Sequence, residues 1–143
     1  TRQERQLKYV LRLEAVLLGC ALPAVFFPHS WMSSVHESLG MGPLPGGPIM
    51  DYLTRSLSLL YFALAPLIWI MAGDPARYLP LLRWLGWGGV LFSVLLLGID
   101  LQAGMPLPWT VSEFAIVFLL SLWIGILAEM LRVSPGRIGK TLP

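Results

Sequence analysis

Charged residues are scarce in this chain of 143 residues. Aspartate, glutamate, lysine and arginine together make up 13% of it, whereas soluble globular proteins contain roughly 25%. Hydrophobic residues make up 56%, and the mean hydropathy is +0.71. So few charges do not cover the surface of a water-soluble domain, and the composition therefore predicts an integral membrane protein.

Cysteine is also nearly absent, since Cys20 is the only one. A single cysteine excludes an intramolecular disulfide and a Cys-x-x-Cys redox centre. The two histidines, His29 and His36, have no cysteine or clustered carboxylates near them in the sequence, so we predict no metal site. The chain also lacks a catalytic motif. We therefore expect a protein that is not an enzyme and has no cofactor of its own, while contact with a quinone, lipid or pigment stays open.

Long uncharged runs are present instead, and with their flanking residues each approaches the roughly 20 residues that a bilayer core requires. These runs predict a single transmembrane domain over residues 1–143, an all-α four-helix bundle. The expected spans are 8–28, 53–73, 79–99 and 111–131.

The ten basic residues are distributed unevenly around these spans. All but Arg55 lie on one side: Arg2, Arg5, Lys8, Arg12, Arg77, Arg83, Arg132, Arg137 and Lys140. By the positive-inside rule, this asymmetry predicts that both termini are cytoplasmic. The net charge of +2 comes from these flanks, so it indicates contact with anionic lipid headgroups and gives no sign of nucleic acid binding.

The first external connection, 29–52, has two parts. Trp31, Val35 and Leu39 recur at four-residue steps, the pattern of a short helix that lies flat on the membrane surface. The glycine- and proline-rich segment 40–48 then returns the chain to the bilayer without regular hydrogen bonding. We expect this interfacial helix and segment to cover the outer end of the bundle.

Polar residues gather at that outer end. Asp100 closes the third span, where a carboxylate opposes the helix dipole and needs a compensating cation. Arg55 begins the second span at the same level, so we predict an Arg55–Asp100 ion pair. Together with Asp51 and His36, this pair forms a candidate external pocket for a headgroup, a quinone carbonyl or a loop of another chain. The alternative is a purely structural clamp.

One carboxylate, Glu14, lies about two turns inside the first span and also needs a partner. Arg83 enters the third span at a comparable depth, so we predict an intramembrane Glu14–Arg83 pair that joins the two helices. A proton or ion pathway is the alternative interpretation. It would require a chain of polar residues across the bilayer, which the sequence does not supply.

Helix starts and contacts are also indicated. Asp74 before Pro75 predicts a helix cap, and Thr110 with Glu113 has the spacing of a capping box that would begin the fourth helix. Small residues at four-residue spacing let helix backbones approach closely in lipid. They predict contact faces, within the bundle or with other chains, at Ala15 and Gly19, Gly89 and Ser93, and Ser121 and Gly125.

The segment 52–113 resembles a known family. The runs Tyr-Leu-Thr-Arg-Ser-Leu at 52–57 and Gly-Ile-Asp-Leu-Gln-Ala-Gly-Met-Pro at 98–106, with the later Glu113, are similar to the DoxX-like small four-helix membrane proteins of bacteria. The resemblance covers about half of the chain. It implies a bacterial inner (plasma) membrane location, and some relatives in that family are linked to quinone-dependent sulfur oxidation.

These observations predict a non-catalytic accessory subunit of a larger integral membrane complex. It would act by helix packing and by docking of its basic tails, 1–6 and 134–143, on acidic surfaces or headgroups. Its partners would be membrane lipids and other integral membrane subunits. The alternative is a small quinone- or lipid-binding, redox-associated membrane protein of the DoxX-like type. A transporter is less expected, because four helices are few for alternating access.

Overall fold

A computed structural model describes residues 1–133, which form helices joined by turns and loops, with no strand in that range. The helices are α1 (Arg2–Gly19), α2 (Leu22–Phe26), α3 (His29–Ser38), α4 (Pro48–Gly73), α5 (Leu79–Ala103) and α6 (Leu107–Val133). Four segments are long and apolar enough to cross a membrane: Arg2–Phe26, Pro48–Gly73, Leu79–Ala103 and Leu107–Val133. The protein is therefore all-α, and its four apolar helices indicate a multi-pass membrane protein.

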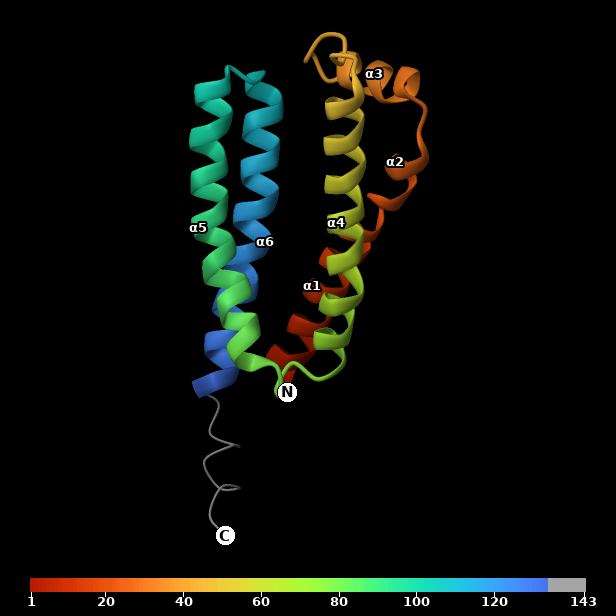
Figure 1. Ribbon diagram of the computed structural model, residues 1–143. Helices are drawn as coiled ribbons and strands as arrows, with labels where there is room; N and C mark the ends of the chain where they lie inside the picture. Colours follow the sequence, from red (N-terminus) through yellow and green to blue (C-terminus); the bar gives the residue numbers. More distant parts are fainter. Residues whose placement is uncertain (134–143) are drawn as a thin grey trace.

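The long helices alternate in direction (Figure 1). α1 and α2 lead to one end of the molecule, where α3 lies across the end of α4. α4 returns to the starting end, a short turn over 74–78 follows, and α5 and α6 complete a second hairpin. As a result, α6 ends at the same end of the molecule at which α1 begins.

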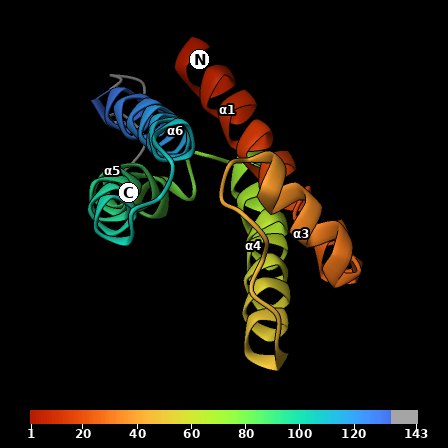
Figure 2. The same cartoon turned by 90° about the horizontal axis from the view of Figure 1, so that it is seen from above.

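The helices pack as two pairs. α5 lies along α6, and α1 lies along α4, with α2 also against α4. Contact between the pairs runs chiefly through α1 and α6, whereas α4 makes no extensive contact with α5 or α6. Seen from above, α5 and α6 lie on one side, and α1, α3 and α4 on the other (Figure 2).

The buried core lies where the two pairs meet, close to the start of α1. We call this the closed end (residues 1–15, 68–86 and 121–133), and the opposite end, with α3 and the α5–α6 turn, the open end (residues 26–57 and 96–114). The core is made of Leu7, Val10, Leu11, Ala15, Ile68, Ala72, Leu79, Leu82, Ile124, Leu127, Ala128 and Leu131. Every member lies at the closed end, so apolar packing joins the pairs there and leaves them apart at the open end.

The small residues lie at contacts within the bundle, one of the two arrangements that the sequence allows. A Cβ added at Gly86 would overlap the backbone of Gly125, and one added at Gly89 would overlap the side chain of Ser121. In the other pair, a Cβ added at Gly19 would lie 3.9 Å from Ala65 Cβ. The close approach of α5 and α6 therefore requires glycine at two positions of α5.

The first span differs from its expected limits. α1 begins at Arg2 because Thr1 and Glu4 form a capping box, with the Glu4 backbone N–H donating to Thr1 Oγ1 at 3.2 Å. Its regular helix stops at Gly19, since Pro23 has no N–H to donate four residues back. Cys20, which falls inside the expected span 8–28, is exposed at this break.

The predicted cap at Thr110 is wrong. α6 begins at Leu107, because Pro108 fits the first turn of a helix and extends it one turn earlier. Thr110 is therefore inside the helix and 1% exposed. The predicted helix cap at Asp74 is also wrong, because α5 begins at Leu79 and its N-cap is Tyr78. Asp74 Oδ1 instead accepts from the Arg77 backbone N–H at 3.1 Å, in the turn that precedes α5.

Candidate functional site

A cleft lies between the two helix pairs, with a volume of about 490 Å³. All four long helices contribute to its wall, which is mainly apolar and includes several polar groups. The lining residues are Glu14, Leu17, Leu18, Tyr61, Leu64, Ile68, Trp84, Leu85, Gly88, Gly89, Phe92, Leu96, Glu113, Ile116, Val117, Leu120 and Ser121. The cleft exists because α4 does not close against α5 and α6.

Glu14 brings an unusual polar group to this wall. Its Oε2 atom is buried and has no hydrogen-bond partner. An unsatisfied buried acceptor costs about 1–3 kcal/mol, so this oxygen favours any donor that enters the cleft. Glu14 comes from α1 and shares the cleft wall with residues of the other helix pair.

A second carboxyl group, Glu113, lines the cleft nearer the open end. Its Oε2 accepts from Trp109 Nε1 at 3.1 Å, and its carboxyl group interacts with that of Asp100 on α5. Asp100 is only 7% exposed, and its backbone carbonyl accepts from Met105 N at 3.0 Å in the turn to α6. This turn needs Gly104, whose φ is +71°.

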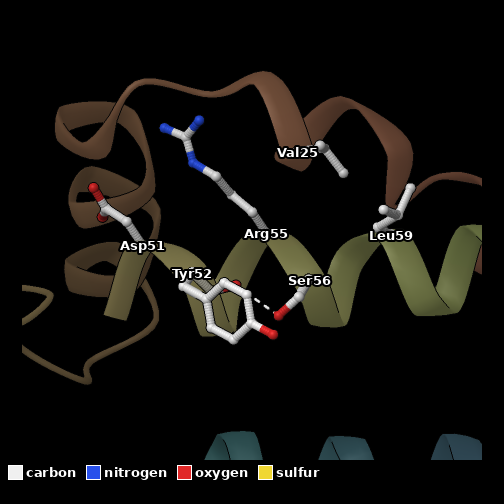
Figure 3. A pocket seen from close by; sticks show the side chains of 6 residues that line it. All are labelled: Val25, Asp51, Tyr52, Arg55, Ser56 and Leu59. Carbon is white, nitrogen blue, oxygen red and sulfur yellow. Dashed lines mark hydrogen bonds between the residues drawn. The ribbon is translucent and has the colours of Figure 1, made fainter. Parts of the chain in front are cut away.

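A separate pocket of about 460 Å³ lies beside α4, between it and α2 (Figure 3). Arg55 extends from α4 toward the segment that joins α2 to α3, and its Nη2 donates to the Phe27 carbonyl at 3.3 Å. The Arg55 Nε is buried and has no hydrogen-bond partner. The other lining residues are Val25, Asp51, Tyr52, Ser56 and Leu59.

The two histidines hold the chain around this pocket. His29 Nδ1 donates to Asp51 Oδ1 at 2.8 Å, which ties the start of α3 to the first turn of α4. His36 Nδ1 donates to the Gly42 carbonyl at 2.6 Å and so fixes the loop that follows α3. Both roles are structural. Among residues 1–133, no three His, Cys, Asp or Glu side chains gather closely enough to hold a metal ion.

The structure brings together only part of the predicted external pocket. Arg55 and Asp51 share one pocket, while His36 lies outside its wall. The predicted Arg55–Asp100 ion pair does not form, because Arg55 lies on the side of α4 that faces α2, and α4 does not pack along α5. Asp100 interacts instead with Glu113.

The predicted Glu14–Arg83 pair is also wrong. Arg83 Nε donates to Glu129 Oε1 at 2.6 Å, because α5 packs along α6 and not along the part of α1 that carries Glu14. Arg132 joins the same carboxylate, with its Nε 2.9 Å from Glu129 Oε2. Glu129 was not among the residues predicted from the sequence. It lies three residues before Arg132 on one helix, however, and this spacing is typical of an ion pair.

Comparisons with known proteins identify no relative: no family model matches the chain, and neither a curated protein nor a solved structure is significantly similar to it. The features of the described residues that indicate a function are therefore the cleft and the Arg55 pocket.

Proposed function

We propose that the protein is a non-catalytic membrane protein that binds an amphiphile, a lipid or a quinol, in the cleft between its helix pairs. The observation that carries this proposal is the cleft itself, about 490 Å³ in volume and lined by all four long helices. Sites for small molecules are typically clefts of about 300–1,000 Å³, mostly apolar with a few placed polar groups. The cleft has both properties.

The polar groups on its wall favour a ligand that donates a hydrogen bond. Glu14 Oε2 is buried without a partner, so a hydroxyl or amide N–H of the ligand would satisfy it. The hydroxyl of Tyr61, also on the wall, can donate to a carbonyl or ether oxygen. A lipid with a free hydroxyl, or a quinol, combines such groups with an apolar body.

The proposed membrane setting is a bacterial inner membrane with the closed end in the cytoplasm and α3 on the outer surface. Its support is the charge distribution of the described residues. The basic residues of α1, of the 74–78 turn, of the start of α5 and of the end of α6 all lie at the closed end, and among residues 1–133 Arg55 alone lies near the open end.

Filling the cleft tests the proposal. Leu64→Trp places a larger side chain in the cleft wall, and Leu67→Trp, at a site that is 56% exposed and outside the wall, is the matched control. The full-length protein is extracted in mild detergent, and bound small molecules are counted by native mass spectrometry with an absorption spectrum of the same fraction. We expect Leu64→Trp to lose the amphiphile and Leu67→Trp to keep it. Equal retention in both variants would refute binding in the cleft.

Glu14→Leu and Glu14→Gln test the hydrogen bond. The leucine variant removes the acceptor, whereas glutamine keeps an acceptor oxygen in the same place. We expect Glu14→Leu to lower the affinity for the bound amphiphile about tenfold and Glu14→Gln to lower it less, since the loss of one hydrogen bond of roughly 1.4 kcal/mol corresponds to a tenfold loss of affinity.

A second candidate is the accessory subunit, in which a transmembrane helix of a partner occupies the cleft. Gly88 favours this alternative, because a glycine on the cleft wall lets another helix backbone approach closely. Docking of the basic N-terminal turn would contribute, while the proposed docking of residues 134–143 lies outside the described residues. Partner chains at a fixed ratio in the same mass spectra, with no amphiphile bound, would select this function.

A further inference from the structure

The second pocket, beside α4, is on the opposite side of that helix from the cleft and has different chemistry. Its wall carries one cation, Arg55, and one carboxylate, Asp51, with an apolar surface next to them (Figure 3). Arg55 and Asp51 are four residues apart on one helix, the spacing at which such a pair usually meets. They do not form an ion pair, since Asp51 Oδ1 accepts from His29 and Arg55 donates to the Phe27 carbonyl.

The Arg55 guanidinium therefore has hydrogen-bond donors that no described group accepts from. Its guanidinium has five N–H donors, and the one hydrogen bond described for it is the 3.3 Å contact to the Phe27 carbonyl. The Nε atom is buried with no partner. Other basic side chains of the described residues do have carboxylate partners: Arg83 and Arg132 bind Glu129, and Lys8 binds Glu4. A guanidinium fork at a partly buried site is suited to a phosphate group.

The Asp51 carboxylate can also accept a further hydrogen bond. Its Oδ1 accepts from His29 Nδ1 at 2.8 Å, and no hydrogen bond is described for its second carboxylate oxygen. Side chains four residues apart on a helix have Cβ atoms about 5–6 Å apart, so a group that binds both must carry a cation close to its phosphate. A phosphate ester with a neighbouring primary ammonium satisfies both residues at once.

The apolar wall indicates that this ligand has acyl chains. Tyr52 is 69% exposed and Leu59 is 51% exposed, and both line the pocket together with Val25 of α2. The pocket also lies where two membrane-crossing segments terminate, close to Phe26 and to Pro48. Headgroups of lipids lie at this level, with their acyl chains running along the helices toward the other end.

We propose that this pocket binds one phospholipid whose headgroup carries both a phosphate and a primary ammonium. Arg55 binds the phosphate, Asp51 binds the ammonium, and the acyl chains lie against Val25 and Leu59. The site is independent of ligand binding in the cleft, because it lies on the opposite side of α4 and shares no lining residue with it.

Lipid titrations of the full-length protein in detergent, followed by native mass spectrometry, test this proposal. The probes are phosphatidylethanolamine, which has the primary ammonium, phosphatidylcholine, whose methylated ammonium cannot donate hydrogen bonds, and phosphatidylglycerol, which has no cation. We expect the first lipid bound to be phosphatidylethanolamine, with an affinity about fivefold above that of the other two. Equal affinities for the three lipids would overturn the proposal.

Two variants assign the roles. Arg55→Gln should weaken all three lipids about tenfold, because the phosphate is common to them. Asp51→Asn should remove the preference for phosphatidylethanolamine and raise the affinity for phosphatidylglycerol, a reversal that loss of folding cannot produce. Arg77→Gln, a basic side chain in the turn at the closed end, is the matched control and should change nothing. A preference that survives Asp51→Asn would exclude the assignment of the ammonium to this carboxylate.

Soluble glycerophosphoethanolamine distinguishes a lipid site from a free phosphate site. We expect no competition at millimolar concentration, since the headgroup alone lacks the chains that contact Val25 and Leu59. Displacement of the lipid by this soluble headgroup at that concentration would show that the pocket recognises a free phosphate ester and would overturn the lipid assignment.

Discussion

At the scale of single residues, Gly86 and Gly89 of α5 allow its close approach to α6. We predict that Gly86→Ala destabilises the protein by about 1–3 kcal/mol, because the new Cβ overlaps the backbone of Gly125 and the helices must separate. Gly98→Ala is the matched control, since no atom lies within 4 Å of its added Cβ, and it should stabilise the helix by about 0.5–1 kcal/mol. Thermal unfolding in detergent measures both. A Gly86→Ala melting temperature equal to that of Gly98→Ala would contradict the α5–α6 packing.

The ion pair between α5 and α6 leads to a second prediction at this scale. In an Arg132→Gln background, which removes the second arginine beside Glu129, Arg83→Glu places two carboxylates together and should lower the melting temperature. The exchanged pair Arg83→Glu with Glu129→Arg in the same background should recover much of the loss. Because both side chains are partly exposed, the effect should shrink as salt concentration rises. Arg77→Glu, which removes a basic charge from the nearby turn, is the control. If the exchanged pair is no more stable than Arg83→Glu alone, the two residues do not interact.

The glycine contact between α5 and α6 was indicated by the sequence, whereas the Arg83–Glu129 ion pair was not. Small residues at four-residue spacing predicted contact faces at Gly89, Ser121 and Gly125. This prediction was possible because the close approach of two helix backbones depends on side-chain size, which the sequence specifies. The partner of Arg83 was not predictable from its depth in the membrane. Glu14 and Glu129 lie on different helices, and the choice between them depends on which helices are neighbours.

At the scale of elements, α3 and the loop after it are held by side-chain hydrogen bonds. His36 Nδ1 donates to the Gly42 carbonyl, and the Leu44 backbone N–H donates to Ser33 Oγ at 3.1 Å. We predict that His36→Ala with Ser33→Ala raises hydrogen exchange in the loop 40–47 about tenfold or more, because each lost bond contributes roughly 1 kcal/mol. Ser34→Ala is the control, since Ser34 Oγ donates only within α3. Unchanged exchange in the double variant would show that other contacts hold the loop.

Element boundaries were predicted unevenly, and proline explains both errors. Pro108 allows α6 to begin one turn before the expected cap at Thr110, and Pro23 interrupts the first span after Gly19. The short helix after the first span was expected from Trp31, Val35 and Leu39, and α3 forms at His29–Ser38. Apolar runs and surface periodicity therefore predicted the elements, while local backbone chemistry set their ends.

At the scale of the whole molecule, the sequence predicted four helices and did not predict that they form two pairs. Each apolar helix has several faces that satisfy the membrane equally well, so hydropathy does not select neighbours. The buried core near the start of α1 and the cleft nearer α3 are products of that selection. The residues of the predicted external pocket do not all come together, because Arg55 belongs to the α1–α4 pair and Asp100 to the α5–α6 pair.

This arrangement predicts unequal freedom at the two ends. Because the core joins the pairs at the closed end, the distance between α4 and α5 should vary more at the open end. Spin labels at Leu53 and Leu101, both exposed near the open end, report this distance, and labels at Ile70 and Leu81 report the closed end. Cys20 is exposed and must first be replaced by serine, or it would also be labelled.

Distances measured by double electron–electron resonance should be broadly distributed for Leu53 and Leu101 and narrow for Ile70 and Leu81. An amphiphile in the cleft contacts both pairs at once, so its addition should narrow the open-end distribution. The closed-end distribution should stay the same, since its core is already packed. A narrow open-end distribution that ligand does not alter would mean that the cleft is rigid, and binding there would then proceed without movement of the helix pairs.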